Sequence, residues 1–205
     1  MGLNDKHTGK RTQFIRKAGM LSGYIANILD KDQRIKRYLY YNTLMPLAKK
    51  SKGYDGKVVE QPDIDFSLID DDYIINGMFD EDMEQLVKNQ LYVHVFKGNR
   101  NDDVNATVYI AINILVDKKF EHLVNKWDLR SYQIGDIVEE LFNDVYIDKN
   151  NTDEEIIKEL GNLHFKLISN GGSFTYDRLS KTNSIVLQSI VLTTTLNTLR
   201  INKDE

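Results

Sequence analysis

The sequence predicts an α+β protein, with a mostly antiparallel sheet flanked by helices and an N-terminal helical arm. Three observations support this fold class. Apolar residues recur every three or four positions near the N-terminus, they alternate with other residues in the middle of the chain, and alternation returns near the end after one more helical stretch. The predicted order is helix, helix, strand, strand, helix, strand, strand.

Two helices are expected in the arm. Over residues 12–29 one apolar stripe is formed by Phe14, Ala18, Leu21, Ile25, Ile28 and Leu29. A second, shorter helix is expected within residues 32–44, before Pro46. Residues 46–62 contain a Lys/Gly-rich segment and are expected to form an exposed loop.

Two strands follow, over residues 91–96 and 107–116, with turn-forming residues between them. They are expected to pair antiparallel. The second strand carries bulky side chains on both faces, such as Ile112 and Leu115, so we place it centrally in the sheet.

The next helix is expected to begin with Ser131 as N-cap and to end at Asn143. Its buried stripe would contain Ile134, Val138 and Phe142. Further strands are expected over residues 165–169, 173–177 and 184–196, the last being rich in Thr, Val and Ile.

These elements divide the chain into three parts. Residues 1–62 form a basic helical arm and loop, residues 63–90 an acidic connector, and residues 91–205 the α+β core domain. The connector has nine acidic and no basic residues between positions 63 and 84, interleaved with apolar residues. We expect its apolar side chains to pack while its carboxylates face water.

Charge is strongly segregated along the chain. Residues 1–57 contain 13 Lys/Arg and four Asp, a net charge of +9, and the rest carries −13 because the whole chain is −4. Such a split allows copies of one protein to attract each other head to tail, or one protein to bridge two neighbours. The simpler alternative is two solvated faces that happen to segregate along the sequence.

No sequence motif indicates an enzyme, a cofactor or a metal site. The chain has no Cys, so disulfides, thiolate catalysis and Cys-based zinc sites are excluded. The acidic clusters do not match a calcium-binding loop, and the four His are too scattered for paired ligands. No apolar run is long enough to span a membrane, and the N-terminal residues lack the apolar region of a secretory signal.

Nucleic-acid binding is an alternative function. Basic residues at 10–17 and 31–37 are interleaved with Phe14, Tyr38, Tyr40 and Tyr41, a mixture suited to contacting phosphates and stacking bases. The net negative charge and the pI near 5.6 argue against a dedicated nucleic-acid binder. If nucleic-acid binding is the function, the chain would be a cytoplasmic nucleic-acid-binding regulator.

The strand at 106–117, the stretch Trp-Asp-Leu-Arg-Ser-Tyr-Gln-Ile-Gly-Asp-Ile-Val-Glu-Glu-Leu-Phe-Asn at 127–143 and the closing strands resemble the neck proteins of tailed bacteriophages, especially tail terminators. The N-terminal helix and loop are also similar to those of neck proteins from phages of Gram-positive hosts. The acidic connector at 63–84 is extra relative to that pattern, and it keeps a head-closure (stopper) protein or another connector protein open as alternatives.

The resemblance implies a structural virion protein that forms a closed ring, typically a hexamer, located in the neck and assembled in the host cytoplasm. Its implied partners are further copies of itself, the tail tube protein and the head-completion or connector proteins, with DNA passing through the ring. A ring requires contacts between two different surfaces of each subunit. The candidate interface residues are Lys10, Arg11, Arg16, Lys17, Arg34, Arg37, Asp70, Asp71, Asp72, Trp127 and Arg130.

Overall fold

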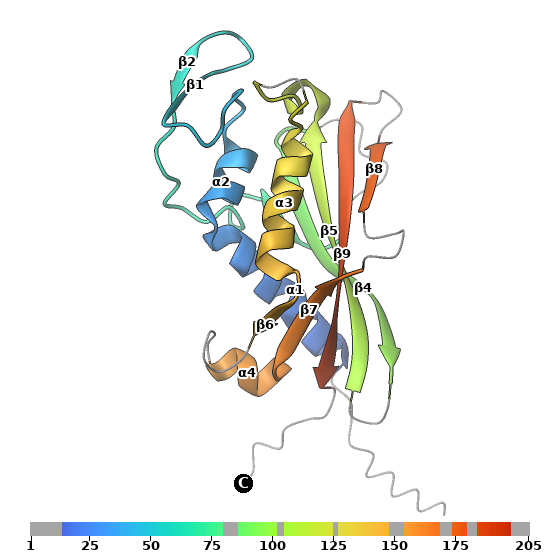
Figure 1. The fold of residues 1–205 in the computed structure, drawn as a ribbon. Coiled ribbons are helices and arrows are strands. Elements are labelled where there is room, and N and C mark those ends of the chain that lie inside the picture. The colour runs from blue at the N-terminus through green and yellow to red at the C-terminus, as the bar shows by residue number, and fades with distance from the viewer. Residues whose placement is uncertain are drawn as a thin grey trace, which may run out of the picture.

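The computed structural model describes residues 14–79, 86–101, 105–124, 127–147, 154–168, 174–179 and 184–197. It confirms the α+β fold class. Figure 1 shows the helices gathered on one side of a twisted sheet. The elements are α1 (Phe14–Lys31), α2 (Gln33–Tyr40), β1 (Lys50–Lys52), β2 (Val58–Glu60), β3 (Ile74–Asn76), β4 (Gln90–Arg100), β5 (Asn105–Asp117), a 3-10 turn (Lys118–Phe120), α3 (Arg130–Phe142), β6 (Val145–Ile147), α4 (Glu154–Leu160), β7 (Leu163–Leu167), β8 (Phe174–Leu179) and β9 (Ile185–Asn197).

The main sheet has the strand order β3-β4-β5-β9-β7-β6. Strand β8 is off this path and also pairs with β9. The predicted antiparallel pair is confirmed as β4 and β5, which align Leu91 with Ile114 and Val93 with Ile112. The predicted central position is also confirmed, because β9 pairs with β5 along the other side. Among the described strands, only β3 runs parallel to its neighbour.

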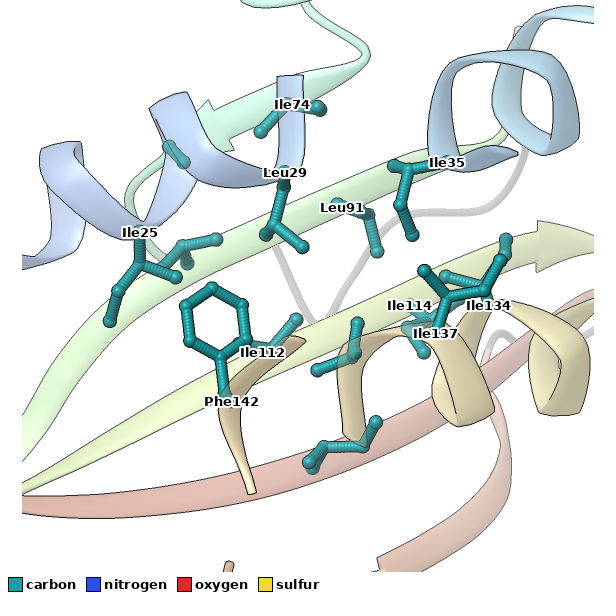
Figure 2. Packing of buried hydrophobic residues seen from close by; sticks show 14 of the residues in the cluster. Ile25, Leu29, Ile35, Ile74, Leu91, Ile112, Ile114, Ile134, Ile137 and Phe142 are labelled. Atoms are coloured by element: carbon teal, nitrogen blue, oxygen red, sulfur yellow. The ribbon is translucent and has the colours of Figure 1, made fainter. Parts of the chain in front are cut away.

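One hydrophobic core joins the first helices to the sheet. Leu29 from α1, Phe142 from α3 and Ile112 from β5 belong to this core, and all three side chains are fully buried (Figure 2). Leu91 and Val93 of β4 face this core, whereas Tyr92 faces a smaller cluster with Leu115 on the opposite side of the sheet. The arm and the core domain of the sequence prediction therefore share a single core.

The residues of the acidic connector divide as expected between packing and solvent. Ile64, Leu68 and Ile74 are buried in the main core. Asp65 and Asp70 are exposed. Positions 80–85, the second half of the acidic stretch, lie outside the described residues.

Two local predictions were wrong. Residues 46–62 are not a plain loop, because β1 and β2 pair antiparallel within them, with Gly56 in the left-handed region at φ +82° in the turn. Three-residue strands with polar ends are too short to produce a visible alternation. Ser131 is not the N-cap of α3 either: Leu129 holds that position without a side-chain cap, and the Ser131 hydroxyl instead bonds the Glu121 carboxylate at 2.5 Å.

Candidate functional site

The described residues hold no cluster of His, Asp and Glu able to bind a metal ion. No helix in the same residues is long and apolar enough to cross a membrane. The features that stand out are surfaces of two kinds, one basic and one acidic, each of which places apolar side chains in solvent.

The β1–β2 hairpin is held in place by buried hydrogen bonds. Thr43 Oγ1 donates to Gln61 Oε1 at 2.9 Å, and Gln61 Nε2 donates to the Pro46 carbonyl at 2.7 Å. The Tyr54 hydroxyl donates to the Phe120 carbonyl at 2.8 Å, which ties the hairpin to the loop before α3. These bonds fix the position of the hairpin relative to the rest of the protein.

Arg130 connects the same two regions from inside. Its side chain is fully buried, and its guanidinium donates to the carbonyls of Phe120 at 2.8 Å, Thr43 at 2.9 Å and Tyr41 at 3.0 Å, as well as to the Tyr38 carbonyl. Burial lowers its pKa and raises the pKa of the neighbouring Glu121 carboxyl, which accepts hydrogen bonds from Ser131. The structure thus uses Arg130 to support the hairpin from inside the protein.

We define the hairpin surface by its exposed apolar side chains and its lysines. A groove of about 350 Å³ opens here between Met45, Val58 and Val124. Trp127, in the same loop as Val124, is 89% exposed. The surface comprises Met45, Leu47, Lys49, Lys50, Lys52, Lys57, Val58, Val59 and Val124.

The lysines of this surface are incompletely neutralised. Lys50 pairs with Glu60 at 2.6 Å and Lys57 with Asp55 at 3.7 Å, and all four side chains are more than half exposed. Lys49 and Lys52 are exposed and form no ion pair with the residues described. An apolar surface with unpaired cations is suited to a partner that is apolar and acidic.

The acidic surface comprises Tyr40, Asp65, Phe66, Asp70, Asp71, Asp72 and Tyr73. The Tyr40 ring makes an edge contact with Phe66 at 5.5 Å and a tilted contact with Tyr73 at 5.8 Å, measured between centroids. Tyr40 and Phe66 are more than one-third exposed. None of these four carboxylates forms an ion pair with a described Lys or Arg. One cation lies on the same surface: Lys88 is 4.4 Å from the centroid of the Tyr73 ring and donates to the Asp71 carbonyl.

Several basic candidates from the sequence have partners within the chain. Lys17 is 2% exposed and donates to the Asn197 carbonyl at 2.8 Å, and burial lowers its pKa. Arg37 is 7% exposed and donates to the carbonyls of Pro46 and Ala48 and to Asp63 Oδ1. Arg34 pairs with Asp32 and Glu140 at 2.7 and 2.6 Å, and Arg16 pairs with Glu159 at 3.5 Å.

The candidate interface residues therefore do not lie on one common surface. Asp70, Asp71 and Asp72 lie together on the acidic surface, and Trp127 is exposed in the segment before α3. Lys10 and Arg11 lie outside the described residues. The hairpin lysines were missed by the sequence reasoning, although the pair Val58-Val59 in an otherwise polar segment was a usable signal.

The aromatic residues invoked for nucleic-acid binding are mostly packed inside. Tyr38 and Tyr41 are less than 10% exposed, and the Tyr41 hydroxyl donates to the Pro62 carbonyl at 2.8 Å. Phe14 packs against the core and touches Gly98. These rings therefore do not offer free faces for stacking bases.

A protein-family model described as YomW matches residues 32–179 of the chain. The chain therefore belongs to the YomW family, a family derived from bacteriophage. A search of curated proteins finds no match.

Proposed function

We propose that this member of a phage-derived family is a structural subunit of the virion neck, a tail terminator that forms a closed ring, caps the tail tube and joins it to the head connector. The ring is expected to be a hexamer that DNA traverses. The protein acts by assembly and not by catalysis.

The observation that carries the proposal is that one subunit presents two surfaces of opposite charge. The hairpin surface presents apolar side chains with Lys49 and Lys52, and the acidic surface presents aromatic rings with Asp70 and Asp71. Contacts that close a ring join two different surfaces of neighbouring subunits. Opposite charges favour such a contact and disfavour contacts between like surfaces.

Charge reversal tests this contact directly. Lys49→Glu/Lys52→Glu reverses the unpaired cations, so that both surfaces are acidic. Asp65→Lys/Asp70→Lys/Asp71→Lys leaves Asp72 as the only carboxylate of the acidic surface beside three new lysines, so that both surfaces are basic. Each variant alone should lose assembly by repulsion, measured as the mass of the species in solution by light scattering over a concentration series at low and moderate salt. An equimolar mixture should assemble again, because each hairpin surface then meets an acidic surface of opposite sign.

The mixture also tests ring order. Alternation of the two variants closes only rings with an even number of subunits, so a hexamer should be restored. The control for the lysine variant is Lys31→Glu/Lys166→Glu, which makes the same change in net charge at exposed positions outside both surfaces. It should assemble as the unmodified protein does. Mixing that restores nothing, with both variants folded, would remove this pair of surfaces as the ring contact.

The position in the neck is tested in phage that lack a functional copy of the gene. Loss of a protein that caps the tail tube should give tubes of uncontrolled length, measured by electron microscopy. Tubes of normal length that fail to join heads would instead identify a head-closure or connector protein, the alternative that the sequence left open.

A further inference from the structure

The outer edge of β4 is a second surface with its own character. β3 pairs with β4 only at Leu91, Tyr92 and Val93, so among the described residues no strand lies beside β4 from His94 to Gly98. An open strand edge offers unpaired N–H and C=O groups to any extended segment that can lie along it. Figure 1 shows β4 running to the free lower corner of the sheet.

Helix α1 turns this edge into a groove. The groove encloses about 350 Å³ between the strand and the helix, and Ile15, Ala18 and Gly19 form its helix side. No other heavy atom lies within 4 Å of the place that a Cβ on Gly19 would occupy, so a chain can approach the helix closely there. Ile15 is 86% exposed and Phe96 is 50% exposed, so two large apolar side chains flank an open edge.

We propose that this groove binds residues 198–205 of a neighbouring copy, which add a short strand to β4. This inference rests on the proposed function, because the ring provides the neighbour. Addition of a strand to an exposed edge takes affinity from backbone hydrogen bonds and specificity from pockets for alternate side chains. Residues 198–205 lie outside the part of the chain that the structure describes.

The sequence of the segment fits the groove. Thr-Leu-Arg-Ile-Asn-Lys-Asp-Glu places Leu199 and Ile201 two residues apart, which puts both on one face of an extended strand. Asp204 and Glu205 follow, and the exposed Lys97 lies at the rim of the groove. The apolar pair matches Ile15 and Ala18 on the helix side of the groove, and the acidic end is opposite in charge to the lysine.

Reach favours a neighbouring copy over the same chain. Asn197, where β9 ends, pairs with Asn105 of β5, which is the strand between β9 and β4. A new strand outside β4 is three strand spacings away, about 14 Å, which takes about four extended residues to cross. Residues 198–201 would be used in the crossing, so neither Leu199 nor Ile201 would enter the groove of the same subunit.

The β-bulge between Val95 and Lys97 limits how far the added strand can pair regularly. Bulges and lysines are the usual protection of sheet edges against unwanted pairing. Only a short stretch with matching side chains is then accepted, and Leu199 and Ile201 lie within three residues of each other.

The chain has no Cys, so introduced thiols report on this contact alone. Full-length Ile15→Cys and Leu199→Cys, carrying tags of different size, are mixed and oxidised, and the mixed disulfide is measured by electrophoresis without reductant. The control replaces Ile15→Cys by Val87→Cys, an apolar side chain that is 97% exposed and does not line the groove. At least about tenfold more mixed disulfide is expected with Ile15→Cys, because binding raises the effective concentration of the two thiols.

Equal yields for the two pairs would overturn the proposal. An intramolecular disulfide in the double variant Ile15→Cys/Leu199→Cys at high dilution would overturn it as well, because the segment would then occupy its own groove. Light scattering on the unmodified protein separates this proposal from the ring. If closed rings form without excess mixed disulfide, the strand exchange is refuted and the ring is not. If excess mixed disulfide forms in open chains without rings, strand exchange is supported and ring closure is refuted.

Discussion

The cations of the first helices and those of the β1–β2 hairpin differ in what they bind. Both groups belong to the basic first part of the chain. Lys17 and Arg37 are buried and donate to backbone carbonyls, whereas Lys49 and Lys52 are exposed and have no ion-pair partner among the described residues. A basic stretch in a sequence is therefore not the same as a basic surface in the fold.

The difference has a physical cause. A buried cation is tolerated only when acceptors replace the water that it loses. Planar guanidinium groups with five donors satisfy several carbonyls at once, as Arg130 and Arg37 do. The hairpin lysines keep their water and remain available for a partner. The exposed basic surface is thus smaller than the charge pattern of the sequence suggested.

The largest expected effect comes from removing the most deeply buried cation. Arg130→Met leaves the carbonyls of Phe120, Tyr41 and Thr43 without their donor in a buried site, and it should lower the free energy of unfolding by about 3–5 kcal/mol. The measurement is urea unfolding followed by circular dichroism. Lys118→Met, at an exposed position, is the control and should change little. A loss below about 1 kcal/mol would mean that these carbonyls find other donors.

A matched pair in the basic part of the chain sharpens the comparison. Arg37→Met removes donors from the carbonyls of Pro46 and Ala48 and should cost about 2 kcal/mol. Lys52→Met in the hairpin should stay within about 0.5 kcal/mol in the same unfolding experiment. Similar losses for both variants would contradict the distinction between internal and external cations.

The sequence predicted the elements with strong periodicity and missed those set by contacts. The apolar stripe of α1 and the alternation in β4 and β5 were sufficient to place these elements, because their cores need regular spacing. The hairpin was missed because its pairing depends on distant groups, such as Gln61 with Thr43 and Tyr54 with Phe120. Local pattern carries no signal for such bonds.

The candidate surfaces were predicted in part for the same reason. Asp70, Asp71 and Asp72 are adjacent in sequence, so their exposure together followed from composition alone. Arg130 looked like a contact residue because its type often anchors interfaces, but its carbonyl partners come from residues about 90 positions away and from the loop before it. Only the fold brings them together.

The smallest expected effect concerns an acidic residue, Asp32, whose carboxylate forms hydrogen bonds within the protein as the buried cations do. Burial acts to raise the pKa of Asp32, but hydrogen bonds from Arg34 and from the N–H groups at the start of α2 outweigh it and hold the pKa below its ordinary value. Because the pKa is lower in the folded state than in the unfolded state, the stability it contributes is present above the ordinary carboxyl pKa, about 4, and is lost as pH falls below it.

Asp32→Asn keeps the cap but removes the charge, so it should cost about 0.5–1 kcal/mol at pH 7 and much less at pH 3. Denaturant midpoints of the variant and the unmodified protein at the two pH values provide the measurement. Asp70→Asn, at an exposed position on the acidic surface, is the control and should change the midpoint little at pH 7. If the cost of Asp32→Asn is the same at both pH values, the charge of Asp32 does not act in folding, and the internal use of charge is then confined to the buried cations.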